Sequence, residues 1–100
     1  MIAVFTVVPL GKEALSKDVS TVIDLIDKSG IDYQLTAMGT IVEGGPDEVW
    51  GLIRRCHEKM RKRANRVSTH ITIDDRKDAT GVLKSKVDDI EQHLARKLKT

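Results

Sequence analysis

Aromatic side chains are almost absent from this chain of 100 residues, which contains only Phe5, Tyr33 and Trp50. A protein that binds RNA by stacking bases on a sheet needs aromatic residues on the central strands of that sheet. The predicted central strands contain Phe5 alone, so we do not expect base stacking. Ile, Val and Leu must therefore supply most of the hydrophobic core.

Cysteine is equally scarce, because Cys56 is the only one. A single cysteine excludes an internal disulfide and any metal site built from several cysteines. Cys56 lies on the apolar stripe of a predicted helix, where packing is more common than nucleophilic chemistry. His57, His70 and His93 have no spacing typical of a metal site. We therefore expect no metal and no cofactor.

Long hydrophobic runs and a strong net charge are also missing. No apolar stretch approaches the roughly 20 residues of a membrane-spanning helix, and the apolar start of the chain lacks the basic segment of a signal peptide. The formal net charge is only +2, so the overall field gives little attraction to nucleic acid or membranes. We predict a cytoplasmic protein, one domain over residues 1–100, with no membrane and no nucleic-acid partner.

Lys and Arg residues gather between Lys59 and Arg66. Such a run most often forms the solvated end of a helix, where positive charge suits the helix dipole. Binding of phosphate or nucleic acid is the alternative. No nucleophile stands beside a base at a catalytic spacing, and there is no Gly-rich phosphate loop, so the sequence gives no support for an enzyme.

The hydrophobic pattern alternates between strand and helix periods. It predicts strands over about residues 2–8, 33–37, 40–44 and 67–73, and helices over about 16–28, from 46 onward, and 81–98. Ser16 is the expected N-cap of the first helix, Gly30 its C-terminal stop, and Met38-Gly39 the turn between the second and third strands. The first six elements match the ferredoxin-like βαββαβ pattern. We predict an α+β fold, with this antiparallel sheet and an added C-terminal helix.

The added helix has a narrow apolar stripe, formed by Leu83, Val87, Ile90, Leu94 and Leu98. Residues spaced in this way resemble a coiled-coil seam and need a partner surface. The first strand is apolar on both faces, yet two helices cover only one face of such a sheet. An open apolar sheet face is an association site, so we expect a homotetramer, with a dimer as the alternative.

Glu43 is the only charged side chain between Asp32 and Asp47, in a hairpin that is otherwise uncharged. Carboxylates are rare in strands and costly to bury without a partner. Several hydroxyls share the predicted strands, and neutral donors with one anion suit a small polar ligand. The alternatives are a surface carboxylate and threonines that simply favour strands. The candidate ligand-binding residues are Glu43, Thr40, Met38, Thr36, Thr6 and Ser16.

Met38, Thr40 and Glu43 lie in one of several short motifs, which extend from near the start of the chain to its last helix. The motifs are Val8-Pro9-Leu10-Gly11, Ser29-Gly30-Ile31-Asp32-Tyr33, Met38-Gly39-Thr40-Ile41-Val42-Glu43-Gly44, Asp75-Arg76 and the last helix. With them the chain resembles the small ferredoxin-like thiamine-binding family. Two positions depart from the pattern: Ala37 replaces a proline before the Met-Gly turn, and the bulky Lys12-Glu13 follows Gly11.

The resemblance implies a non-catalytic protein that binds thiamine or its hydroxymethylpyrimidine half at a sheet or subunit-interface site. It also implies a homotetramer built from sheet-paired dimers. Glu43 then accepts a hydrogen bond from the aminopyrimidine, threonine hydroxyls bond its remaining edge, and Met38 lies against the ring face. The alternative is an oligomeric regulatory or structural module with no thiamine site.

Overall fold

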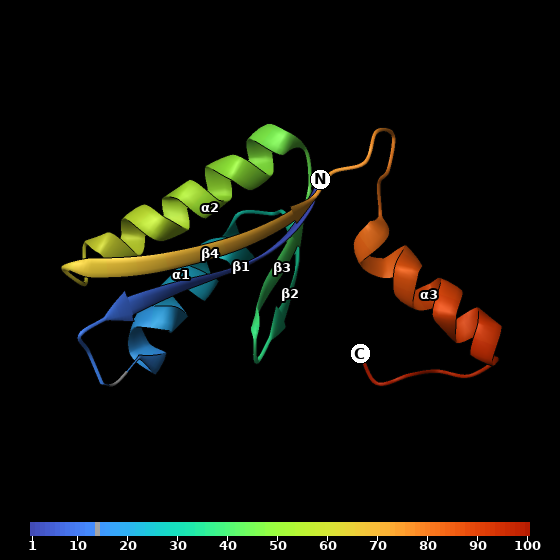
Figure 1. Ribbon diagram of the computed structural model, residues 1–100, viewed down its shortest axis with the longest axis horizontal. Coiled ribbons are helices and arrows are strands. Elements are labelled where there is room, and N and C mark those ends of the chain that lie inside the picture. The colour runs from blue at the N-terminus through green and yellow to red at the C-terminus, as the bar shows by residue number, and fades with distance from the viewer. Residues whose placement is uncertain (14) are drawn as a thin grey trace.

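The computed structural model describes residues 1–13 and 15–100, and its elements alternate as the sequence predicts (Figure 1). The strands are β1 (Ile2–Leu10), β2 (Asp32–Thr36), β3 (Gly39–Glu43) and β4 (Arg66–Asp74), and the helices are α1 (Ser16–Lys28), α2 (Pro46–Arg61) and α3 (Val82–Leu94). No helix in the described ranges is long and apolar enough to cross a membrane.

The four strands form one antiparallel sheet in the order β2-β3-β1-β4. The β1–β4 ladder runs the full length of both strands, from the pair Ile2–Asp74 to the pair Leu10–Arg66. The β1–β3 ladder is much shorter and ends at the pair Phe5–Thr40. This order and the helix that follows β4 confirm the predicted ferredoxin-like α+β fold with an added C-terminal helix.

Helices α1 and α2 cover one face of the sheet (Figure 1). The core between the two layers consists of Ala3, Phe5, Val7, Val22, Ile26, Val42, Val49, Leu52, Ile53, Cys56 and Met60. Every second residue of β1 points into it, as the two-residue period of a strand requires. The intervening residues, Ile2, Val4, Thr6 and Val8, lie on the opposite face of the sheet.

Strand β1 continues two residues beyond the predicted end at Val8. Proline favours the end of a strand because it cannot donate to a ladder, but Pro9 pairs with Val67 and is fully buried. Proline is tolerated here because β3 no longer flanks β1 at this position. A strand edge without a neighbour does not need the missing N–H group.

Helix α1 begins without the expected Ser16 cap. Leu15 is the N-cap, in a helical backbone conformation and with no side-chain hydrogen bond to the helix. Its carbonyl already accepts from Val19, which makes Ser16 the first helical residue. The predicted end is correct, because Gly30 follows the C-cap with a φ of +78°, a conformation that glycine adopts at little cost.

The β2–β3 turn is shifted by one residue from the prediction. Thr36 pairs with Gly39, so Ala37 and Met38 form the connection rather than Met38 and Gly39. The Thr36 hydroxyl donates to the Gly39 carbonyl at 2.7 Å and accepts from the Met38 N–H at 3.2 Å. Gly39 has a φ of +153°, and a Cβ there would lie 3.2 Å from the Phe5 carbonyl oxygen. The turn therefore needs glycine at this position.

Helix α3 lies apart from the two-layer body (Figure 1) and has no buried residue. It is shorter than predicted, because Ala95 adopts a left-handed conformation with a φ of 54° and ends the helix at Leu94. Leu98 therefore lies beyond the helix. The amphipathic stripe predicted a helix correctly, but within this chain its side chains stay partly or fully exposed.

Candidate functional site

The structure divides the six predicted ligand-binding residues among three places. Thr6, Thr36, Met38 and Thr40 line one cavity of about 220 Å³. Glu43 lines a second cavity of about 290 Å³. Ser16 is exposed at the start of α1 and lines neither. Glu43 is three residues from Thr40 along β3, about 10 Å at the usual strand rise, so the predicted residues do not form one site in a single chain.

The first cavity, called the hairpin cavity below, lies between α1 and the β2–β3 hairpin. Its walls also include Phe5, Val7, Val8, Val19, Val22, Ile23, Ile26, Leu35, Ala37 and Gly39. No charged side chain lines it among the described residues. Leu35 and Met38 are 56% and 86% exposed, and they form its rim. The cavity is thus apolar inside, with a polar contribution from threonines and backbone.

An unpaired edge of β1 supplies the backbone groups. Strand β1 has nine residues, β3 has only five, and the β1–β3 ladder ends at Phe5. No backbone–backbone hydrogen bond outside the sheet ladders involves Thr6, Val7 or Val8 among the described residues. Alternate residues of an antiparallel strand direct both N–H and C=O to the same side, and the Phe5 carbonyl faces Gly39 of β3. Val7, two residues further on, therefore presents one donor and one acceptor at this edge beside the cavity.

Thr40 adds one side-chain hydroxyl to this cavity. The residue is only 5% exposed, and none of the described side-chain hydrogen bonds involves its Oγ1. Every fully buried side-chain polar atom of the described residues has a hydrogen-bond partner. Because Thr40 Oγ1 has none, this oxygen is accessible, and the cavity that Thr40 lines is the space that it faces. The Thr36 hydroxyl, in contrast, is used within the turn.

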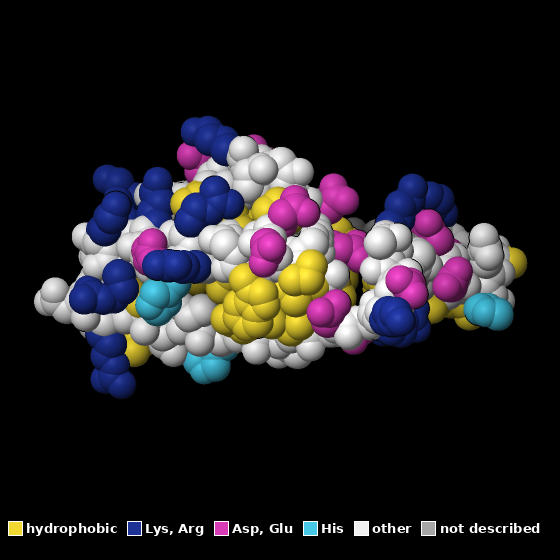
Figure 2. Space-filling view, turned by 90° about the horizontal axis from the view of Figure 1, so that it is seen from above, with side chains coloured by type: hydrophobic (Ala, Val, Ile, Leu, Met, Phe, Trp, Pro, Cys, Tyr) yellow, Lys and Arg dark blue, Asp and Glu magenta, His cyan; other side chains and the backbone are white. Residues whose placement is uncertain are grey.

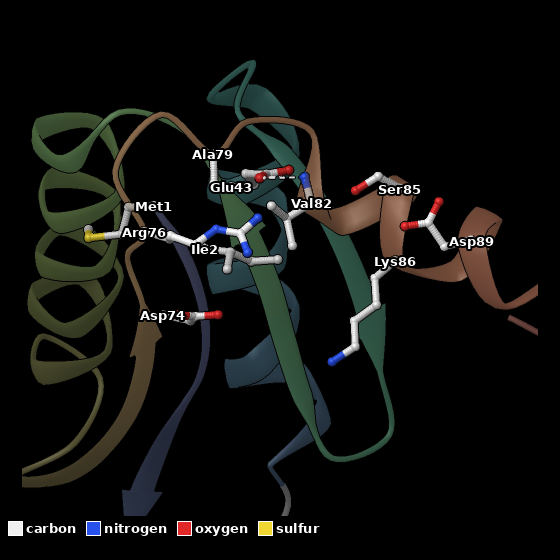
Figure 3. Close-up of a pocket in the computed structure, with 10 residues that line it drawn as sticks. All are labelled: Met1, Ile2, Glu43, Asp74, Arg76, Ala79, Val82, Ser85, Lys86 and Asp89. Carbon is white, nitrogen blue, oxygen red and sulfur yellow. Dashed lines mark hydrogen bonds between the residues drawn. The ribbon is translucent and has the colours of Figure 1, made fainter.

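The second cavity, called the α3 cavity, lies between one end of the sheet and the start of α3 (Figure 3). Its lining is strongly polar and of mixed charge, with Glu43, Asp74, Arg76, Lys86 and Asp89. The Glu43 carboxylate accepts from the backbone N–H of Val82 at 2.8 Å and from that of Leu83 at 3.0 Å. It therefore caps α3, whose free N–H groups and dipole favour a carboxylate.

The only cysteine of the chain, Cys56, lies buried in α2. Burial raises the pKa of the Cys56 thiol to about 11, which keeps the thiol protonated and inert near neutral pH. His57 Nδ1 and Thr69 Oγ1 lie 2.6 Å apart, in a hydrogen bond that joins α2 to β4. No group of three or more His, Cys, Asp or Glu residues that could hold a metal ion occurs in the described ranges.

Sequence reasoning missed two contributors to the hairpin cavity. The first is the β1 edge at Thr6–Val8, which a pattern of side chains does not reveal. The sequence indicates this edge only through a difference in length, because the first predicted strand is longer than the two hairpin strands. The second is the wall from α1, formed by Val19, Val22 and Ile23, whose helical spacing indicates only a face turned to the core.

Comparison with known proteins identifies relatives over nearly the whole chain. Residues 3–91 match the family model described as thiamine-binding protein. The UPF0045 protein YqgV of Bacillus subtilis is 37% identical over 100 residues, covering 93% of this chain and 96% of that protein. The UPF0045 protein MJ1052 of Methanocaldococcus jannaschii is 32% identical over 88 residues, covering 87% of this chain and 88% of that protein.

Solved structures support the same relationship. A crystal structure of MJ1052 superimposes with a TM-score of 0.82 at 30% identity, over 91% of this chain and 95% of that one. A candidate thiamine biosynthesis/salvage protein from Thermotoga maritima superimposes with a TM-score of 0.78, over 89% of this chain and 96% of that chain. At 20% identity, the second match shows the shared fold alone. The family match and the relatives together show that this chain belongs to the thiamine-binding protein family.

Proposed function

We propose that the chain is a non-catalytic protein that binds thiamine, or its hydroxymethylpyrimidine half, in the hairpin cavity. The observation that supports this most is the unpaired β1 edge at Thr6–Val8, which lines an apolar cavity beside the Thr40 hydroxyl. An aminopyrimidine has donors and acceptors on its edge and two apolar faces. Its edge matches backbone N–H and C=O groups, and its faces match the aliphatic walls.

The size and charge of the cavity favour the pyrimidine half as the buried part. Cavities for drug-sized ligands span roughly 300–1,000 Å³, and the hairpin cavity has about 220 Å³. No carboxylate lines it among the described residues, so a cationic thiazolium has no counter-charge inside. We place the thiazolium at the exposed rim, where the Met38 thioether offers a soft, polarizable contact.

Calorimetric titration with thiamine and with hydroxymethylpyrimidine tests this proposal. Thr40→Val keeps the shape of the side chain and removes its hydroxyl, so we expect affinity to fall by about 2- to 12-fold, the equivalent of one hydrogen bond. Thr80→Val, at an exposed position outside the hairpin cavity, is the matched control and should bind normally. Val19→Phe places a ring at the cavity wall and should abolish binding.

One further variant separates the hairpin cavity from the sequence-based hypothesis. If Glu43 anchors the ligand, Glu43→Gln should weaken binding. The proposal for the hairpin cavity predicts that Glu43→Gln binds like the parent chain, because Glu43 does not line that cavity. A thermal-shift screen in which neither compound raises the melting temperature would instead favour an assembly module without a thiamine site.

We also propose that copies of the chain associate into a homotetramer. The sheet face opposite α1 and α2 contains the register pair Val4–Ile41, with Val4 39% exposed, next to Ile2 and Val8. Apolar side chains gathered on one open face favour association. Light scattering after size exclusion should give four chains per particle, and a monomer at micromolar concentration would contradict this.

A further inference from the structure

Basic side chains surround a cavity of about 470 Å³ at the end of the molecule opposite α3. It lies where β1 and α2 end and β4 begins, and Figure 2 shows Lys and Arg side chains gathered at that end. The cations that line it are Lys12, Arg61, Lys62, Arg63 and Arg66, and no Asp or Glu lines it among the described residues. We call it the basic cavity.

The dipole of α2 does not account for this cluster. Lys59 and Arg61 already place positive charge in the last turn of α2, where it offsets the helix dipole. Arg63 and Arg66 lie beyond the helix end, and Lys12 comes from the segment after β1. Cations from separate segments that converge on one hollow repel each other and together attract an anion.

A buried carboxylate fixes the wall of the basic cavity. Asp18, 2% exposed in the first turn of α1, accepts from Arg63 Nε at 2.6 Å and from Lys12 Nζ at 3.1 Å. The Lys12 ammonium also donates to the Arg63 carbonyl at 3.1 Å. The segment after β1 and the first turn of α1 are thus joined to the segment after α2, 45 residues away from Asp18. This network holds Lys12 and Arg63 in place before any ligand arrives.

Donors remain after these contacts are made. Arg63 uses its Nε on Asp18, which leaves the two terminal nitrogens of its planar guanidinium. Among the described residues, no ion pair involves Lys62, Arg66 or Arg61. Arg61 donates to the Ala64 carbonyl at 2.8 Å, which shapes the loop at the cavity. Arginine forks of this kind match the geometry of phosphate oxygens.

We propose that the basic cavity binds a small anion with at least two linked phosphate groups. One phosphate would engage Arg63, and a second would lie between Lys62 and Arg66. Nucleic acid fits less well, because no aromatic side chain lines the cavity for base stacking. Outside the cluster, the chain also contains more Asp and Glu than Lys and Arg. This site is separate from the hairpin cavity and does not depend on the proposed function.

Calorimetric titration of the full chain with inorganic pyrophosphate, at about 0.1 M salt, is the test. We expect saturable binding of one pyrophosphate per chain. The double variant Lys62→Gln/Arg66→Gln should weaken it by about tenfold or more, the usual value of a charge-assisted contact. Lys17→Gln/Lys59→Gln removes the same charge from exposed positions outside the cavity and is the matched control. It should bind pyrophosphate like the parent chain.

One further variant and one further titration define the chemistry of the ligand. Arg63→Lys keeps the ion pair with Asp18 and loses the planar fork, so it should fold normally and bind more weakly. Parallel titrations with a nucleoside diphosphate show whether free or esterified diphosphate is preferred, and binding of either supports the site. Affinity weaker than about 1 mM for both, equal loss in the two double variants, or binding of single-stranded RNA alone would overturn the proposal.

Discussion

Helices α2 and α3 are both amphipathic, yet they have opposite relations to the rest of the molecule. Helix α2 buries Val49, Leu52, Ile53, Cys56 and Met60 against the sheet. Helix α3 buries none of its residues and is joined to the body by the two hydrogen bonds from its N-terminus to Glu43. Packing thus stabilises one helix, and a single side chain caps the other.

This difference shows what an apolar stripe does and does not specify. A stripe with helical spacing predicts that a segment is helical and that one face avoids water. It does not identify the surface that this face will contact. For α2 the surface is the sheet of its own chain, whereas the Ile90 and Leu94 side chains of α3 remain 44% and 47% exposed.

The strongest test of the comparison removes one leucine from each helix. Leu52→Ala should lower the free energy of unfolding by about 2–5 kcal/mol, because it creates a cavity in a fully packed core. Leu94→Ala should change it by no more than about 0.5 kcal/mol, as for other exposed positions. Urea denaturation of dilute protein measures both values. A large loss in Leu94→Ala would show that α3 is packed in solution.

A second test removes the cap of α3. Glu43→Gln loses the charge and one of the two oxygens that accept from Val82 and Leu83. We expect α3 to lose about 0.5–2 kcal/mol of local stability, as for other N-caps, and to exchange its amide hydrogens faster. The amides of α2 should exchange at their original rates.

Asp89→Asn is the control for this cap. It removes the same charge from the α3 cavity, where no described hydrogen bond uses the Asp89 carboxylate. Its effect on exchange in α3 should be small. Equal protection in Glu43→Gln and the parent chain would mean that the carboxylate does not hold the helix.

The smallest expected effect concerns an ion pair of the body. Hydrogen bonds from Arg63 and Lys12 hold the pKa of Asp18 below its usual value of 3.8. A carboxyl with a lowered pKa stabilises the fold above its unfolded-state pKa, and this stability is lost as pH falls through the folded-state pKa. Asp18→Asn should therefore be less stable than the parent chain at pH 7, and the difference should shrink as the pH falls below 3.8 and vanish below the folded-state pKa.

Asp24→Asn provides the comparison for Asp18. Asp24 forms an exposed pair with Lys28 one helical turn away, and such pairs contribute little. Melting temperatures from pH 2 to pH 8 should show a pH-dependent difference for Asp18→Asn alone. Parallel curves for Asp18→Asn and the parent chain at every pH would contradict the assignment.

Much of this fold could be predicted from the sequence, because local patterns determine it. The apolar run of β1, the alternation in β4, the stripe of α2, and Gly30 after α1 each depend on residues close in the chain. The error at Pro9 lies where distant segments decide the outcome, whereas the error at Ser16 is a shift of one residue. Pro9 belongs to β1 because β4 pairs with it while β3 has already ended. Ser16 does not cap α1, since the helical backbone begins one residue earlier.

The candidate site was predicted less well for the same reason. Thr6, Thr36, Met38 and Thr40 do meet at one cavity, because the hairpin turn brings the ends of β2 and β3 beside β1. Glu43 stood out in the sequence as a carboxylate in need of a partner, and within one chain that partner is the start of α3. A contact across 39 residues leaves no trace in local spacing. Its role toward a ligand stays a prediction.

The early end of the β2–β3 hairpin has a consequence for reading related sequences. Each added residue would extend a strand by about 3.3 Å, so a hairpin lengthened by two residues on each side would pair with β1 past Phe5. The added strand would then occupy the space beside Thr6–Val8 and close the hairpin cavity. The count of residues between Asp32 and Glu43 is therefore a marker that can be scored without a structure. Relatives with an insertion there should have a continuous sheet in place of the hairpin cavity.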